Sequence, residues 1–276
     1  VGQRRIVAAM PSLLTLMDGK DEALRAAATK TFGDLSGPGE FPSLLEKLEK
    51  SRSPAEIGAM ERALGLICGG GSKPEGCVQK LADSLSKAGP ETKPSVLRIL
   101  GVNGGADALK VVRNAVNDAN KDVHTAAIRV IGEWKSGEAI PELLELAKSS
   151  TVPVDKVLSL RGYLGMATRK DIPAQDRLSI CREAKPLIQR NDEKLLLLGA
   201  LVNLGDAGSL ELIVPYLDEA GVKNEAVAAV VAIAGKREKK QNVAAAKDAL
   251  GKVVKVAAGS PEAKRAGELL KQMETE

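Results

Sequence analysis

Residues 121–150 hold a two-helix pattern that recurs along the chain and constrains its fold more than any other feature. Asp122 is placed to cap the first helix, and apolar residues follow at helical spacing until Gly132. Pro141 then stands in the first turn of a second helix, whose apolar stripe includes Leu143. Neither helix can bury its apolar face alone, so we expect similar pairs to stack against one another.

Two recurring signals mark the repeats. A Pro-x-Leu-Leu opening begins the second helix of three of them, at Pro11, Pro42 and Pro141. The first helices end in apolar–glycine pairs, where the glycine allows either a close helix crossing or a turn of the chain. These glycines are Gly33, Gly65, Gly101, Gly132 and Gly165. The pattern predicts one all-α domain of about eight helical hairpins. The predicted units are 1–19, 20–51, 52–88, 89–120, 121–150, 151–190, 191–220 and 221–276.

Composition narrows the class further. Apolar residues make up 44% of the chain and aromatic residues only 2%, which predicts a core of Leu, Val, Ile and Ala. The net charge of +4 is spread along the chain, unlike the clustered basic face of a nucleic-acid-binding protein. The densest basic cluster, at 236–240, is interpreted as a solvated loop, with an anion contact as the alternative. No apolar run approaches the roughly 18 residues that span a bilayer.

The repeats resemble a known family. The segments that begin at Asp21 and Asp122, each with an acidic residue, an arginine and paired alanines, resemble HEAT repeats, which form right-handed α-solenoids. More narrowly, short motifs around Trp134, Pro141, Tyr163 and Asp192 are similar to HEAT modules of environmental bacteria. Those modules are often parts of large exported proteins with carbohydrate-active or sugar-binding domains. The resemblance therefore implies a scaffold, and weakly favours an exported or periplasmic location. Because the sequence begins at Val1, we expect it to be a segment of a longer product.

The sequence offers little catalytic chemistry. His124 is the single histidine, which excludes a multi-histidine metal site. There is no Gly-x-Ser-x-Gly elbow, phosphate-binding loop or HExxH motif. The glycine-rich run at 69–74 lacks a preceding strand and the Gly-Lys-Ser/Thr ending, so we interpret it as a turn. We therefore expect no enzyme activity, cofactor or metal.

Cys68 and Cys77 flank that glycine-rich turn, at the end of one helix and the start of the next. A hairpin can bring their Cα atoms within the roughly 5.5–6 Å that a disulfide needs. In an exported protein the pair is a candidate disulfide, and in a cytosolic protein both are buried thiols. Cys181 stands at a helical core spacing and is expected to pack.

Candidate partner-binding residues come from two sources. Trp134, Arg161 and Tyr163 are of the types that anchor interfaces, although packing between repeats explains the two aromatic residues as well. The second helices are expected to line a concave groove with residues of both signs. These are Glu46, Lys47, Lys80, Asp83, Lys110, Arg113, Glu142, Glu145 and Glu211.

The function predicted from these features is a non-enzymatic scaffold that presents a concave helical surface to a protein partner or to another domain of its own polypeptide. One alternative is a nucleic-acid-binding helical-repeat array, which the mixed groove charge and scarce aromatic residues disfavour. The other is an accessory module of a larger exported carbohydrate-active protein, which follows only from the family resemblance. The sequence does not define the oligomeric state.

Overall fold

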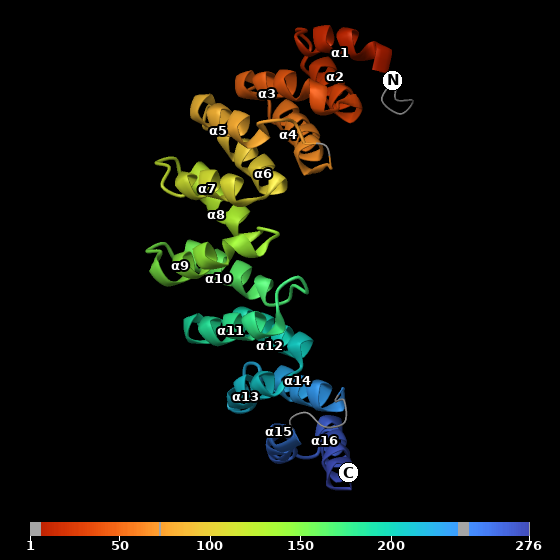
Figure 1. Ribbon diagram of the computed structural model, residues 1–276, viewed down its shortest axis with the longest axis vertical. Helices are drawn as coiled ribbons and strands as arrows, with labels where there is room; N and C mark the ends of the chain where they lie inside the picture. Colours follow the sequence, from red (N-terminus) through yellow and green to blue (C-terminus); the bar gives the residue numbers. More distant parts are fainter. Residues whose placement is uncertain (1–6, 72, 237–242, 276) are drawn as a thin grey trace. The chain divides into compact units, whose positions relative to one another are not determined.

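A computed structural model of the chain describes residues 7–71, 73–236 and 243–275, which are mostly helical and include no β-strand. The chain forms two compact units, Val1–Ala139 and Ile140–Glu276. Figure 1 shows each of them as a stack of helix pairs. The predicted all-α solenoid class is therefore confirmed.

The first unit contains eight α-helices within its described residues. They are α1 (Met10–Met17), α2 (Glu22–Leu35), α3 (Phe41–Lys50), α4 (Pro54–Gly69), α5 (Cys77–Lys87), α6 (Lys93–Asn103), α7 (Ala106–Ala115) and α8 (Lys121–Gly132). Short 3-10 turns occupy Val7–Ala9, Pro38–Glu40 and Gly137–Ala139.

The second unit also contains eight α-helices within its described residues. They are α9 (Ile140–Ser149), α10 (Pro153–Met166), α11 (Ala174–Ala184), α12 (Asn191–Leu204), α13 (Ala207–Ile213), α14 (Lys223–Gly235), α15 (Val243–Val256) and α16 (Pro261–Glu274). Two 3-10 segments, Lys185–Leu187 and Val214–Asp218, extend α11 and α13.

Within each unit, the first helices of successive hairpins pack on one another, and so do the second helices. In the first unit α2, α4, α6 and α8 pack in series, and α3, α5 and α7 form a parallel second row (Figure 1). In the second unit α10, α12, α14 and α16 pack in series, and α11, α13 and α15 form the other row. Each hairpin thus buries its apolar stripes against its neighbours.

Most helix bounds fall inside the predicted units: α2 and α3 lie within 20–51, and α4 and α5 lie within 52–88. The pair α8 and α9 lies within 121–150, but the two helices belong to different compact units. The last predicted unit, 221–276, holds three helices, α14, α15 and α16, within its described residues. The predicted basic cluster at 236–240 lies outside the described residues, except for Lys236.

One predicted cap is wrong. The N-cap of α8 is Asn120, whose side chain accepts hydrogen bonds from the amides of Asp122 and Val123 at 2.9 and 3.3 Å. Asp122 instead lies in the first turn, where its negative charge interacts favourably with the positive end of the helix dipole. Asp21, by contrast, caps α2 by accepting from the Leu24 amide at 3.0 Å.

The apolar–glycine pairs differ in what they do. A Cβ added at Gly33 would lie 2.7 Å from the Cβ of Ala63, so α2 and α4 cross closely there. A Cβ at Gly101 would lie 2.6 Å from a methyl group of Val130, at the α6–α8 crossing. Gly65 has no heavy atom within 4 Å of such a Cβ. Glycine is therefore required by a close helix crossing at Gly33 and Gly101. Gly65 has the same apolar–glycine motif, but no neighbouring helix comes close to it.

The core is aliphatic, as the composition predicts. Leu44, Leu64 and Leu100 are fully buried in the first unit, and Leu197 and Leu201 are fully buried in the second. Burying a side chain of this size contributes roughly 1.5–3 kcal/mol each. Leucines thus supply much of the core, and the five aromatic residues, Phe32, Phe41, Trp134, Tyr163 and Tyr216, are buried as well.

Candidate functional site

Among the open recesses of the first unit, one lies between α3 and α5 and another between α5 and α7. The α3–α5 groove has a volume of about 200 Å³ and includes Glu46, Glu49, Lys80, Asp83 and Lys87 in its lining. The α5–α7 cavity is larger, at about 620 Å³, and includes Lys73, Cys77, Gln79, Asn103, Asp107 and Lys110 in its lining. The recesses are thus lined by charges of both signs, and the predicted concave groove along the second helices stays a prediction.

The charged groups around the α5–α7 cavity are held to different degrees. The Lys73 ammonium donates to the carbonyl of Asn103 at 2.5 Å, which ties the glycine-rich loop to the end of α6. Lys80 donates to the carbonyl of Glu75 at 3.1 Å. Lys110 is exposed and has no hydrogen bond or ion pair among the described residues. An incoming carboxylate would therefore meet at least one ammonium group that is not already engaged.

The two cysteines of the turn come together at the wall of this cavity. Cys68 is the last buried residue of α4, and Cys77 is the first residue of α5. Their Sγ atoms lie 2.9 Å apart. Both are free thiols in this structure. The sequence predicted their proximity from the turn between them, and their covalent pairing stays a prediction.

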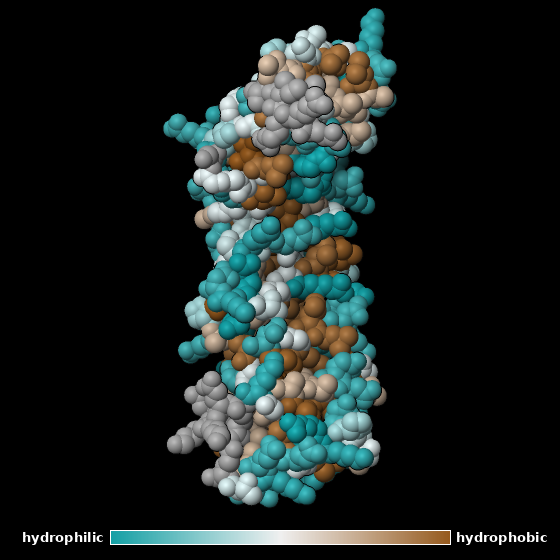
Figure 2. Space-filling model, turned by 90° about the vertical axis from the view of Figure 1, so that its right-hand side faces the viewer, coloured by the Kyte–Doolittle hydropathy of each residue, from teal (hydrophilic) through white to brown (hydrophobic). Residues whose placement is uncertain are grey.

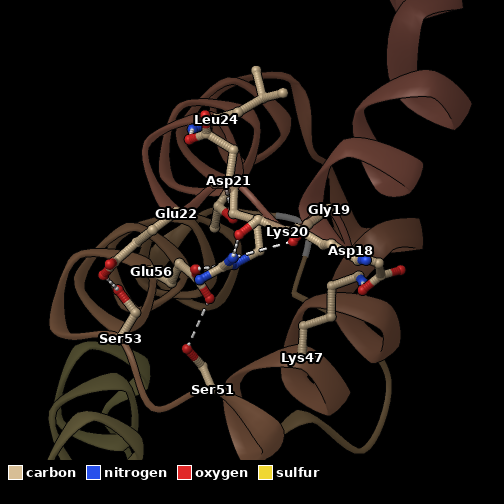
Figure 3. A network of polar contacts seen from close by, with 12 residues as sticks. Asp18, Gly19, Lys20, Asp21, Glu22, Leu24, Lys47, Ser51, Ser53 and Glu56 are labelled. Atoms are coloured by element: carbon tan, nitrogen blue, oxygen red, sulfur yellow. Dashed lines mark hydrogen bonds and ion pairs between the residues drawn. The ribbon is translucent and has the colours of Figure 1, made fainter.

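A polar network joins the first two repeats (Figure 3). The Arg25 guanidinium donates to Glu56 of α4 at 2.9 Å and to the carbonyls of Gly19 and Lys20 at 3.1 and 2.9 Å. Ser51 points toward Glu56 and donates to it at 3.1 Å. This guanidinium thus bonds to the turn before its own helix and to the next first helix.

A similar ion pair occurs in the second unit. Arg161 of α10 lies 3.2 Å from both Asp192 and Glu193 of α12. The Arg25–Glu56 and Arg161–Glu193 pairs join residues 31 and 32 positions apart, which is one repeat length. Sequence reasoning missed these inter-repeat bridges, although an arginine and an acid one repeat apart is a signal that could have found them.

The second unit has its own recess, of about 510 Å³, beside α9, α10 and α12. Lys148, Lys156 and Arg190 bring positive charge to it, and the buried Glu193 lies at its wall. Lys148 lies 3.9 Å from Glu183, at the limit of an ion pair. This recess is therefore more basic than either recess of the first unit.

Of the predicted anchors, Trp134 and Tyr163 are buried, whereas the Arg161 side chain is 38% exposed. Trp134 is 4% exposed, and its indole N–H donates to Glu138 at 3.2 Å. Tyr163 is 1% exposed, and burial, followed by the charges of Glu183 and Cys181, raises its pKa to about 12. Arg161 is committed to Asp192 and Glu193. These observations favour the packing interpretation for Trp134 and Tyr163 and an ion-pairing role for Arg161, and partner binding by all three stays a prediction.

The other predicted surface residues are more accessible. Arg113 is exposed on α7 of the first unit. On α9 of the second unit Glu145 is exposed and Glu142 is half-buried. Exposed large hydrophobic residues are scattered, and on the side drawn in Figure 2 hydrophobic patches are separated by hydrophilic residues. The accessible surface is thus predominantly polar there.

Neither metal binding nor membrane insertion has support in the described residues. They contain no group of three or more His, Cys, Asp or Glu side chains that could hold a metal ion. None of their helices is both long and apolar enough to cross a bilayer. His124 is tied to the backbone, with its Nδ1 donating to the Val116 carbonyl at 2.6 Å.

Stacked helical hairpins with polar recesses between their second helices define an all-α helical-repeat protein. Residues 78–160 match a family model described as HEAT repeats. No curated protein matches the sequence. Nothing in these comparisons bears on the narrower similarity to exported modules of environmental bacteria.

Two solved structures illustrate the likeness. An engineered protein is 18% identical with a TM-score of 0.48, and the match covers 95% of this chain and 77% of that one. Human deoxyhypusine hydroxylase, solved in complex with glycerol, is 14% identical with a TM-score of 0.39, and the match covers 98% of this chain and 97% of that one.

Proposed function

We propose that the chain is a non-enzymatic scaffold that binds a protein partner, or a neighbouring domain of its own polypeptide, through the recesses between its second helices. The observation that carries the proposal is the α5–α7 cavity, an accessible recess lined by both signs of charge with Lys110 not engaged. The first helices already use their faces to pack on one another. The second row therefore has the greater free surface.

Charge complementarity is the proposed basis of recognition. Lys110 and Arg113 are one turn apart on α7, so both can meet one acidic segment of a partner. An acidic residue, Asp107, lines the same cavity as Lys110 and would repel a wrongly placed acidic group. Such arrangements determine orientation and specificity more than affinity. In the second unit Glu142 and Glu145 are the corresponding proposed contacts on α9.

The test is affinity capture from an extract of the source organism with the immobilised chain and a double variant, Lys110→Glu/Arg113→Glu. We expect the specifically captured proteins to fall by about tenfold or more, as for loss of hot-spot contacts. Lys30→Glu, at an exposed position on α2, is the matched control and should change nothing. Equal capture by both variants, or no enrichment over bare resin, would contradict the proposal. Circular dichroism of each variant excludes unfolding as the cause.

The same reagents separate this proposal from nucleic-acid binding. The mixed charges of the recesses favour a protein partner, because a phosphate backbone needs a continuous basic track. A low-salt gel shift that the double variant abolishes would favour a nucleic acid instead.

Export as an arm of a larger protein is a separate proposal, and it rests on the sequence resemblance alone. Fractionation of the source cells with an antibody against this segment tests it. A band much larger than the calculated 28.9 kDa in the exported fraction would support it, and a cytosolic band near that mass would contradict it.

A further inference from the structure

The cysteine pair of the first unit has the arrangement of a redox-active dithiol. Cys68 and Cys77 are joined by a short turn, and their Sγ atoms are 2.9 Å apart. A disulfide bond is about 2.05 Å long, so the two sulfur atoms need only a small side-chain movement to bond. The backbone of the two helices already places both thiols for this reaction.

The two thiols have different surroundings. Cys68 is fully buried near the end of α4, and its hydrogen bond to Cys77, together with burial, raises its pKa far above the ordinary value. The pKa of Cys77 is lowered, first by that hydrogen bond and then by the charges of Lys73 and Lys80, against the opposing effect of burial. Cys77 is therefore the sulfur that more readily carries the negative charge.

The position of Cys77 on α5 strengthens this asymmetry. It is the first residue of an eleven-residue helix, and the N-cap is Gly76, which has no side chain to bond the first amides. Cys77 therefore lies at the positive end of the helix dipole, and a thiolate is stabilised at such a position. Gly76 has a φ of 63°, which lets the chain turn sharply into the helix directly before the thiol.

The α5–α7 cavity gives a small oxidant a route to this sulfur. Cys77 is 5% exposed and contributes to the cavity lining, whereas Cys68 is not exposed. Cys181 of the second unit is also fully buried, and burial is the main cause that raises its pKa to about 12. Among the three cysteines, Cys77 alone combines access with surroundings that favour the thiolate.

We propose that Cys68 and Cys77 are a reversible oxidation site at which hydrogen peroxide converts the two thiols into a disulfide. The Cys77 thiolate attacks one peroxide oxygen, the O–O bond breaks, and Cys77 becomes a sulfenic acid while hydroxide leaves and is protonated to water. The Cys68 sulfur then attacks the Cys77 sulfur, its proton leaves with the hydroxyl group as a second water, and the S–S bond forms. Two electrons pass from the sulfur pair to one peroxide, and a dithiol reductant reverses the reaction. The proposal does not depend on partner binding.

Mass spectrometry of the full-length chain tests the site directly. Trypsin cleaves after Arg62 and Lys80 but not between Lys73 and Pro74, so both cysteines fall in one peptide, 63–80. After peroxide treatment and alkylation we expect this peptide to lose two hydrogen atoms and to resist alkylation. Cleavage after Glu75 should then leave two fragments joined by the disulfide. Treatment with dithiothreitol before alkylation should restore two alkylated cysteines.

Single variants assign the roles of the two sulfurs. In Cys68→Ser the reaction should stop at a Cys77 sulfenic acid, which dimedone traps. In Cys77→Ser the oxidation of Cys68 should slow by about tenfold or more, because its thiol is buried and protonated. Cys181→Ser is the matched control, and its peptide 63–80 should oxidise at the wild-type rate. Matching alanine variants, checked by circular dichroism, keep the test valid if a serine disturbs the fold.

Three outcomes would overturn the proposal. The first is a peptide 63–80 that stays fully alkylatable under conditions that oxidise Cys181. The second is dimedone capture at Cys68 in the wild-type chain. The third is oxidation of Cys77 to a sulfinic acid with no disulfide, since this would show that Cys68 does not resolve the sulfenic acid.

Discussion

The guanidinium of Arg161 donates through both Nε and Nη2 to one carboxylate oxygen of Glu193, at 3.2 Å for each nitrogen. The two residues come from consecutive first helices, α10 and α12, and Glu193 is only 1% exposed. The buried Glu193 carboxylate, paired with the Arg161 guanidinium, thus connects neighbouring repeats. The pair is thus a structural element, although Arg161 is also of the residue type that anchors interfaces.

Arg161→Ala should therefore destabilise the second unit by about 2–3 kcal/mol, because it leaves the Glu193 charge buried without its main partner. Arg161→Lys should recover part of the loss, since an ammonium cannot reproduce the two-nitrogen contact. Urea unfolding followed by circular dichroism measures both. Arg265→Ala is the control: it breaks an exposed ion pair with Glu268 and should cost less than about 1 kcal/mol. An Arg161→Ala protein of unchanged stability that has lost its partner would instead support Arg161 as an interface anchor.

Trp134 is the single tryptophan and lies in the first unit, so its fluorescence reports on the structure around this residue. At 4% exposure we expect blue-shifted emission that moves to longer wavelength on unfolding. Trp134→Ala should cost about 3–5 kcal/mol, as for other large-to-small core substitutions. Trp134→Phe should cost less, because it loses mainly the hydrogen bond to Glu138.

The same probe tests how the two units unfold. Circular dichroism reports on all helices, whereas tryptophan fluorescence reports on the surroundings of Trp134, near the end of the first unit. If the units unfold separately, the two urea transitions should not coincide in midpoint or slope. Coincident transitions would show that the whole array unfolds cooperatively.

Gly33 and Gly65 form a matched pair for testing helix crossings. Gly33→Ala should destabilise the chain by about 1–3 kcal/mol, because its new methyl group would meet the Ala63 Cβ at 2.7 Å. Gly65→Ala should stabilise it by up to about 1 kcal/mol, since the site is open and alanine favours the helix. Thermal unfolding of both variants gives the comparison. Equal effects would mean that the α2–α4 crossing relaxes without cost.

High pH should destabilise the second unit. The Cys181 pKa is raised from 9.0 to about 12, and burial is also the main cause that raises the pKa values of Tyr163 and Tyr216 from 10.0 to about 12. These groups ionise more readily in the unfolded chain, so their contribution is complete below pH 9 and is lost as the pH rises toward 12. Cys181 alone should lower the unfolding free energy by about 1.4 kcal/mol per pH unit in this range. Urea midpoints at pH 8 and pH 10, with Cys181→Ala as the comparison, measure the effect.

The sequence predicts the helices well because their signals are local. Pro42 and Pro141 stand at the second residue of α3 and α9, as expected from the Pro-x-Leu-Leu openings. The cap of α8 was displaced by two residues, because Asn120 and Asp122 are both good capping residues and only the backbone conformation distinguishes them. Local chemistry thus defines the elements to within a few residues.

The candidate site is less predictable because it depends on pairs of distant residues. Gly33 and Gly65 carry the same motif, and only the neighbouring helix makes one crowded and the other open. Arg161 is of a residue type that anchors interfaces, but its partners 31 and 32 residues later determine its role. The proximity of Cys68 and Cys77 was predictable because one short turn joins them. Which thiol carries the charge depends partly on the cations nearby, Lys73 and Lys80.

The arginine–carboxylate bridges have a consequence for how such a chain can change in length. Arg25 and Glu56, like Arg161 and Glu193, are separated by one repeat. Duplication or loss of a complete repeat therefore preserves this spacing, and an arginine can still pair wherever the adjoining repeat has an acidic residue at the matching position. Insertion of a few residues inside a first helix would break that phase at once. Such an array should accordingly tolerate the gain or loss of whole repeats during evolution, and small insertions should be found in the turns.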